Sequence, residues 1–248
     1  MRLLEIVQSY QSPLDQAISQ VAQMAHLVNY KAGLLRGSSK KGPLTQMRVR
    51  QDRTPLDASM AASVVFNYWI EQKTGVPNVR FRAMYATTSY SAAADYANGA
   101  VYCVLPVNTA TVVYHPELSD SLQLLKRINR SLLEISDAIS TIELSSADPA
   151  SVSIQKIMDR LQPDEVEAFK TLLSTPPARM AGYVAGKAGD LAPVESDGIN
   201  HPEIMIVDVS AVWAFDAELL HDWDPEIHGT HYSGALTYLV NKALENQQ

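Results

Sequence analysis

The stretch Asn200-His201-Pro202-Glu203-Ile204-Met205-Ile206-Val207 joins a polar segment to an apolar one at a single carboxylate. The four apolar residues after Glu203 predict a buried strand. The segment before it, Tyr183 to Asn200, contains three glycines and a proline and is predicted to be a mobile loop. A carboxylate between a rigid strand and an adaptable loop is well placed for catalysis, although the same pattern also fits a residue that only caps a strand edge.

The composition is that of a folded domain. The chain has 248 residues, 46% hydrophobic and 19% charged, enough to bury one large core, with or without an appendage. Its one cysteine, Cys103, lies in the apolar run 101–105, so we expect a buried, unreactive thiol. Polar residues interrupt the N-terminal segment, and no apolar run approaches the roughly 18 residues of a membrane span. We therefore expect a protein of the reducing cytoplasm without a membrane partner.

Charge is unevenly distributed along the chain. The net charge of −7 argues against general nucleic-acid binding. Residues 1–53 contain 8 Lys/Arg and 3 Asp/Glu (+5), which leaves 12 and 24 (−12) for the rest. The basic first part suits contact with phosphates or an acidic partner, or an ordinary solvated surface.

The first part of the chain is predicted to be helical. Apolar residues recur every three or four positions over 14–35, which indicates an amphipathic helix ending near Gly33. The Gly- and Ser-rich segment 37–43 reads as a linker. We therefore predict an N-terminal helical arm at 1–45, separable or docked, before a domain at 46–248.

The rest of the chain contains short strand patterns interrupted by a long helical block, which predicts an α+β fold. Thr54 and Pro55 suit an N-cap and the first turn of a helix. Strands are expected at 46–53, 79–86, 100–105 and 111–114, with one or two more within 204–215. Helices are expected at 55–73, 91–97 and 233–244, with the helical block at about 117–175.

Three features in order resemble a known family. They are an arginine at the first strand, a second strand ending in Thr87-Thr88-Ser89, and a glutamate at a later strand after a glycine-rich loop. This order resembles the NAD-dependent ADP-ribosyltransferases of the Arg–Ser–Glu type. Short motifs look most like small transferases and related uncharacterised proteins of bacterial viruses; they lie at 48–55, 81–87, 94–96, 101–106 and 202–205. The resemblance covers about residues 46–215 and implies a split β-sheet core into which the helical block is inserted.

The resemblance implies roles for charged residues. Cleavage of the nicotinamide–ribose bond of NAD passes through an oxocarbenium-like ribose, which the family's glutamate stabilises, and Glu203 matches that position. The family's first-strand arginine binds the NAD phosphates. Arg50 and Arg53 are both candidates for it, and the strand pattern does not choose between them.

Hydroxyl and aromatic residues are implied as well. Thr87 matches the hydroxyl that orients the catalytic glutamate, and Thr88 and Ser89 match its neighbours at the nicotinamide pocket. Tyr85 and Tyr96, together with Tyr90, suit stacking on nicotinamide or adenine, or packing in the core.

The acceptor is less well defined. Arginine-modifying members of the family carry an acidic residue two positions before the catalytic glutamate, where this chain has His201. An arginine acceptor is therefore in doubt, and His201 is a candidate base or acceptor contact.

The resemblance implies a phage mono-ADP-ribosyltransferase that uses NAD as substrate, needs no metal, and modifies a host macromolecule, above all a protein, in the host cytoplasm. Two alternatives stay open: an NAD glycohydrolase, and a catalytically silent relative that serves as a binding or structural module. His221, His228 and His231 lack a recognised metal-ligand pattern. Phosphate-loop, dinucleotide-glycine and Gly-x-Ser-x-Gly motifs are absent from the sequence.

Overall fold

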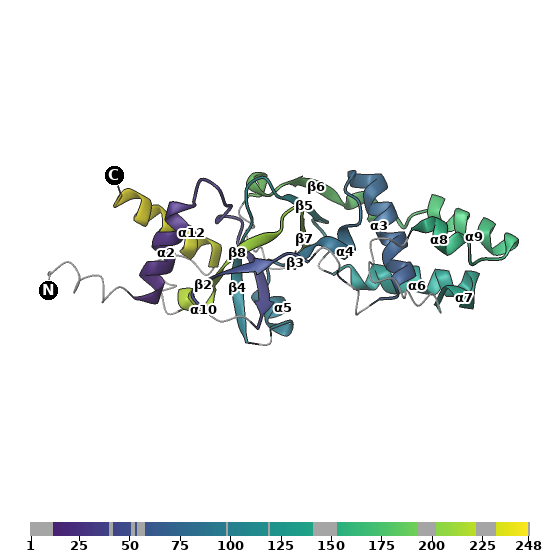
Figure 1. Cartoon of the computed structure of the whole chain (residues 1–248), viewed down its shortest axis with the longest axis horizontal. Helices are drawn as coiled ribbons and strands as arrows, with labels where there is room; N and C mark the ends of the chain where they lie inside the picture. The colour runs from purple at the N-terminus through teal and green to yellow at the C-terminus, as the bar shows by residue number, and fades with distance from the viewer. Residues whose placement is uncertain are drawn as a thin grey trace.

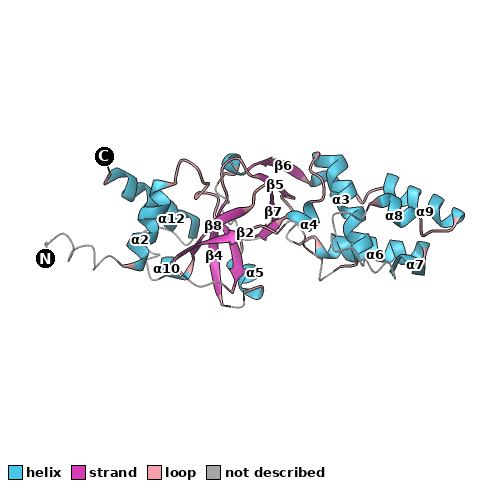
Figure 2. Ribbon diagram, in the orientation of Figure 1, coloured by secondary structure: helices cyan, strands magenta, loops and turns pink. Residues whose placement is uncertain are grey.

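The computed structural model confirms an α+β fold. It describes residues 12–39, 42–50, 53, 58–97, 99–118, 120–140, 153–192, 202–221 and 232–247. In these residues ten α-helices accompany two four-stranded sheets, and every strand pair is antiparallel. The molecule is elongated, with helices at both ends and the sheets between them (Figures 1 and 2).

The two sheets are joined edge to edge. The first sheet has the order β1 (Leu34–Ser38), β4 (Ala100–Leu105), β8 (Ala211–Asp216), β2 (Leu44–Arg48). The second has the order β3 (Met84–Ala86), β7 (Ile204–Val207), β5 (Thr111–Tyr114), β6 (Val184–Lys187). Leu35 and Thr87 form an isolated bridge between β1 and the end of β3, with reciprocal N–H···O distances of 2.6 and 2.8 Å.

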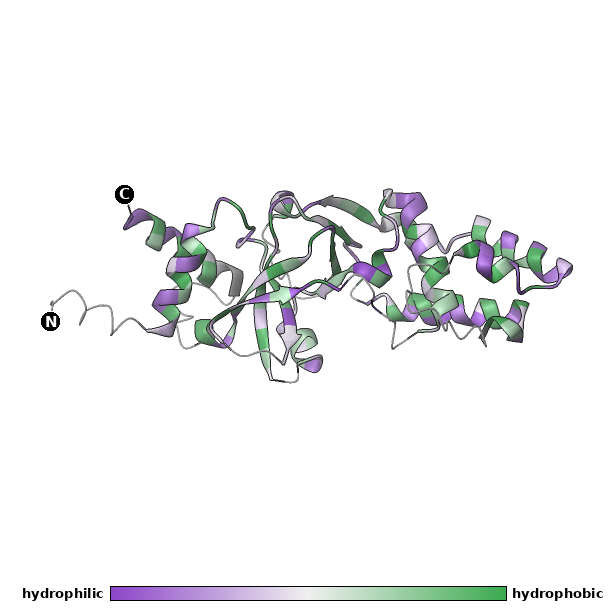
Figure 3. Cartoon of the chain, in the orientation of Figure 1, coloured by the Kyte–Doolittle hydropathy of each residue, from purple (hydrophilic) through white to green (hydrophobic). Residues whose placement is uncertain are grey.

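Strands β4 and β7 are buried on both faces, which explains their uninterrupted apolar sequences. In β7, Ile204 and Ile206 pack between the two sheets, whereas Met205 and Val207 pack beneath the helices of the second sheet. In β4, alternate side chains likewise point to the inter-sheet core and to the helices of the first sheet. The fold is therefore a stack of helices, sheet, sheet and helices. Green predominates along these central strands in Figure 3.

Helices cover the outer face of each sheet (Figure 1). The first sheet is covered by α2 (Pro13–Gln23), α10 (Glu218–His221) and α12 (Tyr232–Glu245), and α5 (Tyr90–Asp95) packs on β1. The helices beyond the second sheet are α3 (Met60–Thr74), α4 (Val79–Arg82), α6 (Leu122–Ile135), α7 (Asp137–Ser140), α8 (Ile154–Met158) and α9 (Pro163–Ser174). Helices α6 to α9 lie between β5 and β6 in the sequence, as expected for the helical block.

The predicted helix at 14–35 is wrong in its second half. Helix α2 ends at Gln23, Gly33 adopts a left-handed conformation (φ 65°), and residues 34–38 form β1. Leu34 and Leu35 are buried on opposite faces of the strand, so the sequence shows no strand-like alternation there. Strand β1 precedes the predicted boundary at residue 45, and β2 crosses it. Both strands pair with later strands of the first sheet.

Two other expectations need correction. The predicted strand at 79–86 is divided into the helical turn α4 and the strand β3, because Asn67 Oδ1 accepts the backbone N–H of Arg80 at 2.7 Å and Asn78 turns the chain at φ 53°. Helix α3 begins at Met60, where Ser59 Oγ accepts from Ala62 N at 3.2 Å. The predicted cap Thr54-Pro55 lies outside the described residues.

The glycine-rich segment before Glu203 is partly ordered. Residues 184–187 form the edge strand β6, and 188–190 form a 3-10 turn, where a loop was expected. Strand β6 pairs with β5 over its full length. Residues 193–201 lie outside the described residues.

Gly37 in β1 should resist substitution more strongly than Gly186 in β6. A Cβ atom on Gly37 would lie 2.3 Å from the carbonyl oxygen of Ala93, whereas one on Gly186 meets nothing within 4 Å. We expect Gly37→Ala to lower the free energy of unfolding by about 1–3 kcal/mol or more, and Gly186→Ala by no more than about 0.5 kcal/mol. Urea unfolding of both variants checks this, and equal effects would contradict the close approach of α5 to β1.

Candidate functional site

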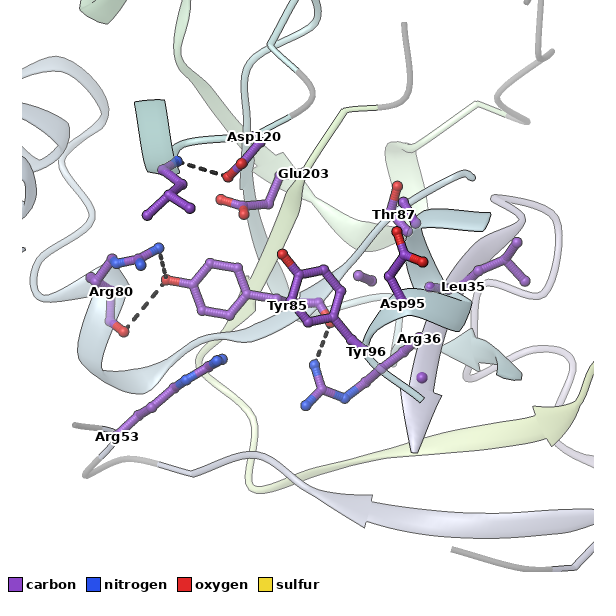
Figure 4. Close-up of a pocket in the computed structure, with 15 residues that line it drawn as sticks. Leu35, Arg36, Arg53, Arg80, Tyr85, Thr87, Asp95, Tyr96, Asp120 and Glu203 are labelled. Atoms are coloured by element: carbon purple, nitrogen blue, oxygen red, sulfur yellow. Dashed lines mark hydrogen bonds between the residues drawn. The ribbon is translucent and has the colours of Figure 1, made fainter. Parts of the chain in front are cut away.

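A cavity of about 480 Å³ lies beside the junction of the two sheets, between α5 and the start of α6 (Figure 4). It collects side chains from segments far apart in the sequence. The polar residues of its wall are three arginines, three carboxylates, two tyrosines and a threonine: Arg36, Arg53, Arg80, Asp95, Asp120, Glu203, Tyr85, Tyr96 and Thr87. A wall with both charges suits a ligand with anionic and cationic parts.

Glu203 directly precedes β7 and is partly buried. Its Oε1 accepts a hydrogen bond from the Ser121 hydroxyl at 2.7 Å. Burial raises the pKa of the Glu203 carboxyl, the Ser121 hydrogen bond and the charge of Arg80 lower it, and the charge of Asp120 raises it. In Figure 4, Glu203 and Asp120 lie together on one side of Tyr85.

Arg80 links the cavity to α4. Its side chain is only 8% exposed, and its Nη1 donates to the hydroxyls of Ser121 and Tyr85, both at 3.2 Å. The guanidinium carbons of Arg53 and Arg80 lie 4.5 and 5.4 Å from the centre of the Tyr85 ring. Burial raises the pKa of Tyr85 to about 12, so the phenol stays protonated at neutral pH. These contacts make Tyr85 a fixed part of the wall.

Arg36 belongs to β1, the first strand of the structure. Its Nη1 donates to the carbonyl oxygen of Tyr85 at 2.5 Å, across the junction of the two sheets. Burial lowers the pKa of Arg36, and the neighbouring positive charge of Arg53 lowers it further. In the described residues no ion pair joins either arginine to a carboxylate. Two adjacent guanidinium groups of this kind suit the binding of an anion.

Five of the residues predicted from the sequence meet in this cavity. Glu203, Thr87, Tyr85, Tyr96 and Arg53 all line it. The register of β3 and β7 pairs Ala86 with Ile204, and one further step would place Thr87 opposite Glu203.

The hydroxyls of the Thr87-Thr88-Ser89 segment are used locally. Thr87 Oγ1 accepts from Ser89 N at 3.2 Å, and Ser89 Oγ caps α5 by accepting from Ala92 N at 3.2 Å. Thr88 is partly buried beside the cavity but does not line it. No hydrogen bond joins Thr87 to Glu203 in the structure, so the hydroxyl on Glu203 belongs to Ser121.

Two predicted residues lie elsewhere. Arg50 is exposed and does not line the cavity, so Arg53 is the one of the two candidates that the structure places there. His201 lies outside the described residues, as do His228 and His231. Tyr96, at the end of α5, is 73% exposed at the cavity rim.

Four polar residues of the cavity wall were not predicted as site residues: Arg36, Arg80, Asp95 and Asp120. Ser121, which donates to Glu203, was missed as well. Arg36 was hidden by the helical prediction over 14–35, although it would have been the first-strand arginine had Leu34–Ser38 been recognised as a strand. Arg80 was assigned to a strand and faces the cavity from a helical turn instead. Nothing in the local sequence distinguishes Asp120 and Ser121 from an ordinary helix start.

Other expectations can be assessed. Cys103 is buried, and burial raises the pKa of its thiol to about 12, which confirms an unreactive cysteine. In the described part of the chain, His, Cys, Asp and Glu side chains form no group of three or more that could hold a metal ion. None of the described helices combines the length and apolarity needed to cross a membrane.

Compared with known proteins, the chain matches no protein-family model, no curated protein and no solved structure. The fold and the cavity therefore define it, as an α+β protein whose two antiparallel sheets meet beside a cleft of mixed charge.

The pKa of Glu203 predicts how stability depends on pH. Because the pKa of the folded state lies above the ordinary value of 4.5, the folded protein binds the proton more tightly, and stability is lost as pH rises through this range. Gln cannot titrate, so we expect the free energy of unfolding of Glu203→Gln to increase relative to wild type between about pH 4 and about pH 8. Urea unfolding at both pH values measures this difference. A difference that shrinks with rising pH would show that the pKa is lowered instead.

Proposed function

We propose that the protein is an NAD-dependent mono-ADP-ribosyltransferase that cleaves the nicotinamide–ribose bond and transfers ADP-ribose to a macromolecule of a host cell, above all a protein. One observation carries the proposal. An arginine of the first strand, a threonine at the end of β3 and the glutamate before β7 line the same cavity. The resemblance to the Arg–Ser–Glu transferases was based on the same order of residue types, with the first arginine sought at 46–53, and Arg53 from that range lines the cavity as well.

Arg36 and Arg53 suit the binding of the NAD pyrophosphate. The resemblance implies a phosphate-binding arginine on the first strand and gave Arg50 and Arg53 as candidates; the first strand of the structure carries Arg36, and Arg53 lies near it. The pyrophosphate is doubly negative and would relieve the repulsion between the two guanidinium groups. We therefore assign the first-strand role to Arg36, with Arg53 as its neighbour, in place of a choice between Arg50 and Arg53.

Glu203 suits the reacting end of NAD. When the bond between ribose C1′ and the pyridinium nitrogen breaks, its electron pair goes to nicotinamide, which leaves neutral, and positive charge develops on the ribose. The ionised carboxylate of Glu203, in a partly buried site, stabilises that charge more strongly than it would in water. The acceptor then forms a bond to C1′ and gives up a proton to a base or to solvent.

Tyr96 is the ring that we assign to stacking on the ligand. Arg53 and Arg80 already lie near the ring of Tyr85, which makes that ring a support for the guanidinium groups. Tyr96 presents an aromatic side chain, 73% exposed, at the rim of the same cavity. An exposed aromatic face suits nicotinamide or adenine.

The architecture supports the same proposal. The resemblance implies a split β-sheet core with an inserted helical block. Here two antiparallel sheets meet at the Leu35–Thr87 bridge, and α6 to α9 are inserted between β5 and β6.

Removal of the Glu203 charge should abolish the reaction. Incubation with labelled NAD and a bacterial lysate should release nicotinamide and label macromolecules, and Glu203→Gln should reduce both signals on the order of a hundredfold or more. Glu167→Gln on the exposed surface of α9 is the matched control and should leave both unchanged. Nicotinamide release without label would indicate a glycohydrolase, and the absence of both signals in the wild type would overturn the proposal.

Arg53 and Arg50 provide a matched pair for the phosphate site, since both precede α3 but only Arg53 lines the cavity. We expect Arg53→Gln to raise the KM for NAD roughly tenfold or more, because a hydrogen bond to a charged group contributes about 1.5–3 kcal/mol. Arg50→Gln should change KM less than about twofold. Steady-state kinetics of nicotinamide release measure both. An equal effect of the two substitutions would argue against phosphate binding at Arg53.

A further inference from the structure

We propose that Ser121, held in place by Arg80, is the residue that positions the carboxylate of Glu203. This inference rests on the proposed function, in which the resemblance implied Thr87 for that task. It assigns the task to the helical side of the molecule and not to the strand that carries Thr87.

The hydrogen bond from Ser121 to Glu203 has a fixed direction. Arg80 Nη1 donates to Ser121 Oγ at 3.2 Å, and Ser121 Oγ lies 2.7 Å from Glu203 Oε1. A hydroxyl has one proton, and the guanidinium can only donate. Because Arg80 occupies a lone pair of Ser121, the proton of Ser121 points to the carboxylate. The bond is short and charge-assisted, as expected for a strong one.

Water hardly competes with these groups. Ser121 is 1% exposed and Arg80 is 8% exposed. The backbone N–H of Arg80 is held by Asn67 of α3, and Tyr85 accepts a second hydrogen bond from its Nη1. Arg80 is therefore held at its backbone N–H and at its guanidinium group, and the guanidinium group in turn holds the Ser121 hydroxyl.

Ser121 belongs to the helical block. It directly precedes α6, and its carbonyl oxygen accepts from Leu125 N at 3.0 Å. Glu203 itself is tied to the same segment, because its backbone N–H donates to the carbonyl oxygen of Leu118 at 3.4 Å. The start of the inserted block therefore holds the glutamate through both its side chain and its backbone.

Several charged and titratable groups face Glu203 and set the background for a test. They are Arg80 on α4, Arg53 before α3, Asp120 beside Ser121, Tyr85 on β3 and Tyr183 before β6. In addition to these groups, the Ser121 hydrogen bond lowers the pKa of Glu203. Its loss should therefore raise that pKa.

The test compares Ser121→Ala with Ser121→Thr, which keeps the hydroxyl. Ser136→Ala is the matched control, because Ser136 is a buried serine at the other end of α6. The carboxyl of Glu203 is titrated by NMR in protein labelled with ¹³C at glutamate side chains, with Glu203→Gln identifying its signal. We expect Ser121→Ala to raise the pKa of Glu203, and Ser121→Thr to restore it.

Kinetics give the second readout. Ser121→Ala should lower kcat for nicotinamide release roughly ten- to a hundredfold, the loss expected for a hydrogen bond to a charged group, and change KM for NAD less than about threefold. Ser121→Thr should recover most of kcat. An unchanged Glu203 titration in Ser121→Ala, or an equal shift in Ser136→Ala, would overturn the inference. If Ser121→Ala shows the titration shift but the wild-type protein does not turn over NAD, the enzyme assignment alone would be overturned.

Discussion

The pair of hydrogen bonds between Leu35 and Thr87 is the constraint on which the cavity depends. It is an isolated bridge that joins the edge strand of one sheet, β1, to the end of the edge strand of the other, β3. Leu35 and Thr87 both line the cavity beside this bridge. Arg36 bonds to the Tyr85 carbonyl across this junction, so the polar wall of the cavity follows directly from the way the sheets meet.

The cavity brings three arginines and three carboxylates into one wall. Arg80 is nearly buried, and its Nε has no hydrogen-bond partner in the structure. Arg53 lies close enough to Arg36 for its positive charge to lower the pKa of Arg36. Buried charges of the same sign are costly, and an anion bound between the two guanidinium groups would offset that cost. Glu203 is in a comparable position, because burial opposes the charge of its carboxylate and raises its pKa.

Sequence patterns identified the strands that follow simple rules. Strands β4 and β5 were predicted at their observed bounds, because both are short, rich in β-branched or aromatic residues and flanked by turns. Strand β1 could not be found in this way, since Leu34 and Leu35 are buried on opposite faces and continue a helical spacing. Among site residues, Glu203 and Thr87 stand at strand ends that the sequence marks. Arg80 and Ser121 are recognisable only once α4 and α6 are packed together around Glu203.

Because Ser121 depends on this packing, the helical block helps to position Glu203. Phe66 of α3 and Leu125 of α6 are fully buried in the core that also contains Met205 of β7. Core side chains pack at crystal-like density, so the position of α6 relative to β7 is held to within a small tolerance. The position of the Ser121 hydroxyl is therefore equally well defined, and so is the position of the carboxylate that it contacts. A glutamate at the start of an inner strand thereby acquires a fixed direction from helices inserted earlier in the chain.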